Sequence, residues 1–400
     1  MTKVLNYSGL IRSFSNLYPH NLLLKVVDFK TSKEIGIIPE LQKMYTYANF
    51  EIVSNKYLEY GFYNTYRYSF PNDFDYMPET YAYPEQKDLI LKKFENYILE
   101  EGNLWLIKPK TLSLGIGIHI FHNLSDVPSE YIITKYIEKP HLINNLKYDF
   151  RIYVIITGLS PLKIYVYKEG IIRFATEEYS LDFNKIDEDF IFLTNVAHNI
   201  KNKDKYKISM DPDTDEGSKW SLQVYQNFCK KNGIDFNKIW DQIKDISIKS
   251  ILTSKDYFLD KIKRIGTKDK NYFKLLGFDF LLDQNFKLHL LEINSRPSLL
   301  MNEINDLKLK PQLVADILNI VGISPFSHDY RDNFKAYDDD LENEQIGENQ
   351  EGVEGALCEF GRPRGKFELI FPVKEKTNYY KQFYKANIEA DEILWEILEK

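Results

Sequence analysis

The segment Phe273–Ser298 reads FKLLGFDFLLDQNFKLHLLEINSRPS, and it decides the fold. Two apolar runs flank Asp283-Gln284-Asn285, a pattern typical of a β-hairpin. If the turn pairs Asp283 with Phe286, the two-residue period of a strand places three polar side chains on one face: Asp279, Glu292 and Asn294. Two acids and an amide offer the oxygen ligands that Mg²⁺ uses beside substrate phosphates. A half-buried hairpin with solvated acids explains this segment equally well.

The composition is that of a folded protein with two or three lobes. The chain has 400 residues, of which 44% are hydrophobic and 15% aromatic. Cys229 and Cys358 provide neither a zinc spacing nor a disulfide framework, which favours a reducing compartment. Because no leader pattern and no apolar run of membrane-spanning length is evident, we expect a cytoplasmic protein without a membrane partner. A net charge of −7 argues against nucleic-acid binding.

The chain divides into segments of different character. Short strands in the centre and helical patterns beside them predict an α/β (α+β) fold with mixed or antiparallel sheets. Helices are expected at Asp88–Glu100, twice between Trp220 and Leu259, and at Asn378–Glu399. We predict an N-terminal lobe at 1–104, a central lobe at 105–147, a C-terminal lobe at 148–326, an acidic disordered linker at 327–355 and a tail at 356–400.

A glycine-containing loop is the first candidate for phosphate binding. Lys108 lies on an apolar strand that leads through a polar loop to Gly115 and Gly117. Glycines let backbone N–H groups approach phosphate closely, and a fixed lysine adds charge. The chain lacks a P-loop, and Gly115-Ile-Gly117 lacks the third glycine of a dinucleotide loop. A plain β-turn whose glycines supply positive φ is the alternative.

A second candidate is the strand around Lys147. The two-residue period places Lys147, Asp149 and Arg151 on one face and apolar residues on the other. Burying two cations and an acid without a function is costly unless they pair with one another. Arg173, on a companion strand, adds a planar fork for a carboxylate or phosphate. The alternative is a salt-bridged ladder on a solvated face.

Taken together, these motifs resemble the tubulin–tyrosine ligase-like family, from about residue 16 to 324. They occur in the family's order: Lys108-Pro109 with Gly115-x-Gly117, Lys135-Tyr-Ile-Glu-Lys-Pro140, Lys147-Tyr-Asp-x-Arg151, Arg173-Phe-Ala175, Leu193-Thr-Asn195, Lys219-Trp220, Gly277-Phe-Asp279 and Leu291-Glu-x-Asn294-x-x-Pro297. The resemblance implies an ATP-grasp fold with ATP between two lobes, and a ligase that joins an amino acid to a protein carboxylate through an acyl phosphate.

The resemblance also implies a role for each matched residue. Catalytic cations would be Arg151, Arg173 and Lys147, with Arg173 holding the incoming amino acid or the transferring phosphate. The nucleotide would be bound by Lys108, Gly115, Gly117, Lys135, Ile137, Asp149, Thr194 and Asn195. Mg²⁺ would be held by Asp279, Glu292 and Asn294, so ATP and Mg²⁺ are the expected cofactors.

Within the family, the chain is most similar to the glutamate-adding branch. The implied partners are free glutamate and acidic tubulin tails, and a monomer on microtubules is expected, with the cilium or basal body as further locations. The basic segment Lys261–Lys274 is either an acceptor-binding surface or a solvated loop. Glycine or tyrosine ligation, a non-tubulin acidic substrate and a catalytically silent microtubule adaptor stay open. So do the choice between α- and β-tubulin and that between initiation and elongation.

Three positions depart from the family pattern. Leu114 stands where many relatives have Arg before the first glycine, Thr134 where they have Gln, and Phe192 where they have His. These replacements alter the predicted nucleotide pocket. None of them removes a predicted magnesium ligand, so the resemblance implies an active enzyme.

Overall fold

The computed structural model describes most of the chain from residue 56 onward. The described residues are 22–23, 43–44, 56–111, 115–124, 127–182, 189–265, 269, 272–323, 348–373, 376–384 and 388–399. In that part of the chain, no helix combines the length and the hydropathy needed to cross a bilayer.

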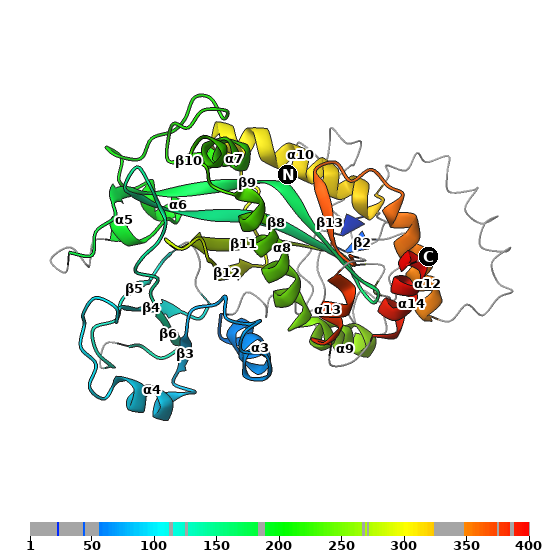
Figure 1. The fold of residues 1–400 in the computed structure, drawn as a ribbon, viewed down its shortest axis with the longest axis horizontal. Coiled ribbons are helices and arrows are strands. Elements are labelled where there is room, and N and C mark those ends of the chain that lie inside the picture. The colour runs from blue at the N-terminus through cyan, green and yellow to red at the C-terminus, as the bar shows by residue number, and fades with distance from the viewer. Residues whose placement is uncertain are drawn as a thin grey trace, which may run out of the picture.

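A seven-stranded antiparallel sheet forms the centre of the molecule (Figure 1). Two long strands, β8 (Leu146–Leu159) and β9 (Leu162–Glu178), pair along most of their length. β11 (Lys274–Leu282) pairs with β8 and with β12 (Leu288–Asn294). Three shorter strands complete the sheet: β7 (Leu142–Ile143) beside β8, and β10 (Lys219–Ser221) and β13 (Phe367–Phe371) beside β9.

A smaller sheet forms a front lobe, drawn in cyan in Figure 1. Its order is β3 (Thr80–Tyr83), β6 (Tyr131–Lys135), β4 (Trp105–Pro109) and β5 (His119–Ile120). Helices α3 (Lys56–Ser69) and α4 (Lys87–Phe94) precede and follow β3, and a separate two-stranded pair joins β1 (Leu22–Leu23) to β2 (Lys43–Met44). Because β3 pairs with β6, the predicted boundary at residue 104 is wrong: it cuts through one sheet.

Helices cover both faces of the central sheet. On one face, α7 (Leu222–Lys231) and α8 (Phe236–Leu252) pack through Tyr225 and Ile243 on the even-numbered side chains of β8. On the other face, α10 (Ile304–Val321) packs on Tyr153 and Ile155. This double coverage explains why β8 is buried along nearly its whole length. The predicted pair of helices after Trp220 is confirmed, and Gly233, in the turn between them, has a φ of +68°.

The remaining helices lie around the ends of the central sheet. Short α5 (Asp189–Phe192) and α6 (Val196–Asn199) follow β9, and α9 (Lys255–Ile265) follows α8. The C-terminal segment forms α12 (Glu348–Phe360), α13 (Thr377–Lys381) and α14 (Glu389–Glu399).

Three predictions about segments need correction. The predicted linker is helical in its described part, 348–355, because Val353 and Ala356 of α12 bury against Leu394 of α14; residues 327–347 lie outside the described residues. The tail helix predicted at 378–399 is two helices, α13 and α14. The helix predicted at 88–100 ends at Phe94, since Tyr97 bonds through its backbone N–H to the Phe94 carbonyl in a turn.

Candidate active site

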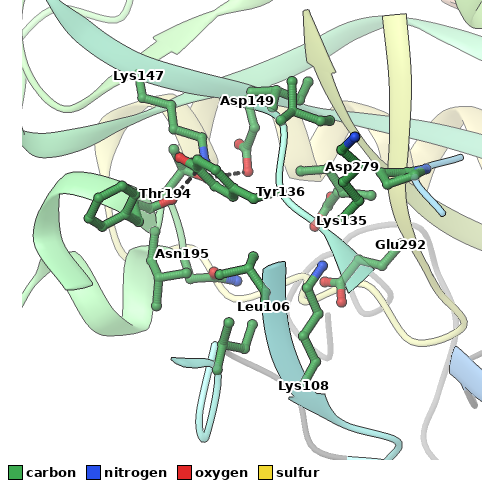
Figure 2. A pocket seen from close by; sticks show the side chains of 17 residues that line it. Leu106, Lys108, Lys135, Tyr136, Lys147, Asp149, Thr194, Asn195, Asp279 and Glu292 are labelled. Atoms are coloured by element: carbon green, nitrogen blue, oxygen red, sulfur yellow. Dashed lines mark hydrogen bonds between the residues drawn. The ribbon is translucent and has the colours of Figure 1, made fainter. Parts of the chain in front are cut away.

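A cleft lies between the front sheet and the central sheet (Figure 2). Strands β4 and β6 form one wall, β8, β11 and β12 form the other, and the segment from α5 to α6 closes one side. Nine of the predicted site residues line this cleft: Lys108, Lys135, Ile137, Lys147, Asp149, Thr194, Asn195, Asp279 and Glu292. The cleft therefore gathers side chains that are far apart in the sequence.

The hairpin β11–β12 brings the two acids together through an irregular register. The Asp283 N–H bonds to the Lys287 carbonyl and Leu282 pairs with Leu288, so the predicted pairing of Asp283 with Phe286 is wrong. That register alone would turn Glu292 to the opposite face from Asp279. A β-bulge at Leu291 restores the phase, since Phe280 pairs with Leu290 and Asp279 with Glu292.

The third predicted ligand, Asn294, completes this cluster. Its Nδ2 lies 3.3 Å from Asp279 Oδ2 and 3.2 Å from Glu292 Oε1. Two carboxylates that line the cleft and one amide thus converge. Among the described residues, no group of three His, Cys, Asp or Glu side chains forms a metal cage. Two carboxylates plus an amide instead match the way Mg²⁺ is held together with substrate phosphates.

Two arginines tie the acids of neighbouring strands into one row. Arg151 lies directly across from Asp279, and its Nε and Nη2 donate to the two carboxylate oxygens at 2.5 and 2.8 Å. Arg173 lies across from Asp149 and donates to it at 2.6 and 2.7 Å. Arg173 Nη2 also lies 2.9 Å from Asp279 Oδ2. Burial raises the pKa of Asp279, but the two guanidinium groups outweigh it and hold that pKa well below its usual range.

Lys147 is a buried cation at the inner end of the cleft. Its side chain is 5% exposed, and its Nζ donates to the Tyr136 hydroxyl at 2.9 Å and the Phe192 carbonyl at 2.7 Å. Burial lowers the pKa of Lys147 to about 7, although the nearby Asp149 carboxylate raises it. Both hydrogen-bond partners are uncharged, so the positive charge suits an anionic ligand.

The segment after α5 is fixed to the central sheet. The Thr194 hydroxyl donates to Asp149 Oδ2 at 2.5 Å, as Figure 2 shows, and Asn199 Nδ2 donates to the Leu193 carbonyl at 2.7 Å. Gly115 has φ +80°, and a Cβ there would lie 3.0 Å from the Asn195 side chain. The glycine loop therefore packs directly on the wall that carries Asn195. Gly117, with φ +74°, packs on Pro109.

Comparison with known proteins identifies the family. A family model described as the tubulin-tyrosine ligase family matches residues 38–330. The chain belongs to the tubulin-tyrosine ligase family. With the two antiparallel sheets, this match confirms the predicted α/β ATP-grasp fold.

Several curated proteins of this family are similar to the chain. It is 34% identical over 252 residues to tubulin monoglutamylase TTLL4 of Mus musculus, covering 62% of this chain and 21% of the relative. It is 32% identical over 252 residues to tubulin polyglutamylase TTLL5 of Homo sapiens, which covers 62% of this chain and 19% of that relative. It is 30% identical over 292 residues to tubulin polyglutamylase TTLL7 of Mus musculus, which covers 70% of this chain and 31% of that relative. The chain thus spans a fifth to a third of the length of these relatives.

The residues of this cleft suit a magnesium nucleotide. Lys108, Lys135 and Lys147 bring three ammonium groups to the cleft that also holds Asp279 and Glu292. The sequence analysis missed the apolar wall, which a flat purine ring could contact: Leu106, Ile118, Tyr136, Phe192, Leu281 and Leu291. Apolar residues in strands point to either a core or a cleft, so their spacing alone gives no signal. Of these apolar residues, the sequence analysis named only Phe192, because it departs from the family pattern.

The departures from the family pattern have distinct structural outcomes. Phe192 packs edge-on against Tyr136, with ring centroids 5.6 Å apart, and thus braces the residue that holds Lys147. Thr134 is 3% exposed, and its hydroxyl lies 2.8 Å from the Thr80 hydroxyl, so it faces the neighbouring strand instead of the cleft. Leu114 lies outside the described residues.

The described residues of the basic segment Lys261–Lys274 are not among those that line this cleft. Lys274 is 1% exposed inside β11, and burial lowers its pKa to about 7. Helix α9, which carries the described cations, contacts β8 and packs on α3, where the Tyr257 and Phe62 ring centroids are 5.5 Å apart. The prediction of an acceptor surface here is wrong for Lys274, because a lysine on a strand that is covered on both faces is buried. Lys268 and Lys270 lie outside the described residues.

Proposed function

We propose that this protein is an ATP-dependent ligase that adds glutamate to glutamate side chains of tubulin C-terminal tails, a tubulin polyglutamylase. One observation carries the proposal: the row of Asp279, Glu292 and Asn294 shares a cleft with three lysines. The names of the relatives, which are tubulin mono- and polyglutamylases, support glutamate as the added amino acid and tubulin as the acceptor.

The chemistry requires an activated acceptor. An acceptor carboxylate attacks the γ-phosphorus of ATP, releasing ADP and forming an acyl phosphate. The amine of free glutamate then attacks the acyl carbon, an amide bond forms and phosphate leaves with the electron pair of the broken bond. Negative charge builds up on phosphoryl oxygens and then on the tetrahedral oxygen, so fixed cations lower both barriers.

Each predicted site residue has a role in this proposal. Lys108 and the backbone of Gly115 and Gly117 bind the phosphates, and Lys135 and Ile137 border the base. Arg151, Arg173 and Lys147 stabilise the developing negative charge. Asp149 orients Arg173 and Thr194, the two groups it contacts, and Asn195 supports the glycine loop. Mg²⁺, held by Asp279, Glu292 and Asn294, would neutralise phosphoryl charge when bound.

The wider setting follows from the same proposal. The partners are free glutamate and an acidic tubulin tail, and the place of action is the microtubule in the cytoplasm, with cilia and basal bodies included. We propose further that the protein acts as a monomer.

The test measures ATP-dependent incorporation of labelled glutamate into purified tubulin. Glu292→Gln should lower incorporation by on the order of a hundredfold or more, because a carboxylate at the phosphate site becomes neutral. Glu354→Gln, the same change at an exposed position on α12, is the matched control and should keep wild-type incorporation. Equal incorporation by wild type and Glu292→Gln contradicts the catalytic role.

A panel of amino acids and acceptors decides between the alternatives. Preferred incorporation of glycine or tyrosine would reassign the branch of the family. Incorporation into other acidic proteins, with none into tubulin, would reassign the acceptor. ATP-independent microtubule binding without any incorporation would favour a silent adaptor.

A further inference from the structure

The carboxylate of Asp279 is fully engaged within the protein. Its Oδ1 accepts from Arg151 Nε at 2.5 Å, and its Oδ2 accepts from Arg151 Nη2 at 2.8 Å and lies 2.9 Å from Arg173 Nη2. The side chain is 3% exposed. A cation that approaches Asp279 in this arrangement meets two guanidinium groups first. Glu292, in contrast, is only half-buried.

The two arginines differ in how firmly they are held. Arg173 makes a complete two-bond contact with Asp149, at 2.6 and 2.7 Å, and Asp149 is itself fixed by Thr194. Arg173 therefore keeps a charged partner even if it leaves Asp279. Among the described residues, Arg151 forms its ion pair with Asp279, and the Arg151 side chain is 14% exposed. Arg151 thus has the weaker hold and the greater exposure of the two, and it contacts Asp279, which lines the cleft, so it is the arginine that an anion bound beside Asp279 can draw away.

We propose that Arg151 is a gate on the cation site. It closes Asp279 in the nucleotide-free protein and releases it when an anionic phosphate takes over the guanidinium group, so cation and nucleotide bind cooperatively. This inference rests on the proposed nucleotide-binding function. Binding cooperativity is reciprocal: a nucleotide that opens the gate raises the affinity for the cation, and the cation raises the affinity for the nucleotide by the same factor.

The first experiment measures Mn²⁺ binding to the nucleotide-free protein by electron paramagnetic resonance. Wild type should bind weakly, and Arg151→Gln should bind at least about fivefold more tightly, because Asp279 loses its two-bond partner. Removal of any nearby positive charge could act through long-range attraction alone. Lys139→Gln, which neutralises an exposed lysine near the same cleft that has no role in the proposed site, controls for that effect and should change Mn²⁺ affinity less than twofold, roughly.

The second experiment measures binding of the non-hydrolysable ATP analogue AMP-PNP with Mn²⁺ and with a chelator. The gain in affinity that Mn²⁺ provides should be larger in wild type than in Arg151→Gln, by about the factor found in the first experiment. Mn²⁺ binds free AMP-PNP equally in both titrations, so that contribution cancels in the comparison. Thermal unfolding of each variant checks that the fold is kept.

Three outcomes separate the gate from the proposed function. The gate is overturned if Arg151→Gln binds Mn²⁺ no more tightly than wild type. It is also overturned if Lys139→Gln gains as much affinity as Arg151→Gln. If AMP-PNP binds to neither protein with or without Mn²⁺, the proposed function fails, while the Mn²⁺ titrations still judge whether Arg151 closes Asp279.

Discussion

Because the Lys147 ammonium group is buried, the stability of the folded protein depends on the pH. In the folded chain its ammonium group contacts a phenol and a carbonyl, whereas in the unfolded chain it is hydrated. The folded protein therefore binds this proton less tightly, with a pKa of about 7 against an ordinary value of 10.5. Between these two values the unfolded chain carries more protons than the folded one.

We predict that the free energy of unfolding of the nucleotide-free protein contains a Lys147 contribution that increases as the pH rises from about 7 towards 10. The slope for this one group is at most about 1.4 kcal/mol per pH unit. Lys147→Met should remove that slope, which urea unfolding at several pH values would measure. Lys135→Met, at an exposed lysine of β6, is the control and should keep it. An unchanged slope in Lys147→Met would contradict the burial argument.

The sequence predicted which charged residues belong to the site, but it did not predict which residue each of them pairs with. The period of a strand was enough to place Lys147, Asp149 and Arg151 on one face. The partner of Arg151 is Asp279, which lies 128 residues away, and the pairing depends on how β8 and β11 align. That alignment follows from core packing on both faces of the sheet, which a local pattern does not encode.

At the scale of the element, the β-bulge at Leu291 determines which side chains of the hairpin face the cleft. It places two consecutive residues, Leu291 and Glu292, on the cleft wall. The sequence analysis put Asp279 and Glu292 on one face, which is correct, through a turn that is one residue too short. The extra turn residue and the extra bulge residue compensate for each other, and only tertiary structure reveals either of them.

Two single-residue deletions test this register. Deletion of Leu291 removes the bulge and leaves Glu292 opposite Asp279, so Mn²⁺ binding in the presence of AMP-PNP should persist. Deletion of Ile293 removes a core side chain and turns Asn294 towards the core, so it should destabilise the protein by about 2–5 kcal/mol and abolish that binding. Both deletions shorten β12 by one residue and thus serve as matched controls. Greater damage from the Leu291 deletion would contradict the register.

At the scale of the whole molecule, the C-terminal segment is part of the central sheet. The family match ends at residue 330, yet β13 pairs with β9. Glu359 of α12 is 5% exposed and accepts hydrogen bonds from Thr157, Lys163 and Tyr165 of the long strands. The sequence analysis treated this segment as linker and tail because its composition is acidic and interrupted by glycines. The few apolar and charged residues that pack on the central sheet do not stand out in such a composition.

We predict that Glu359→Gln lowers the free energy of unfolding by about 3 kcal/mol, because it leaves the buried Lys163 ammonium without its anion. Glu354→Gln makes the same change five residues earlier on α12, where the side chain is exposed, and should alter stability by less than about 0.5 kcal/mol. Chemical denaturation of both variants compares them directly. Equal stability of the two would mean that α12 does not anchor the segment to the sheet.

The pairing of β13 with β9 also has a consequence for how the chain is made. A ribosome completes β9 at residue 178 and reaches β13 only at residue 367. At translation speeds of roughly 5–20 residues per second, part of one side of β9 stays uncovered for on the order of ten seconds or more. Such an open strand edge invites pairing with another nascent chain. Production of this protein should therefore depend on chaperones that shield β9 until its last neighbour emerges.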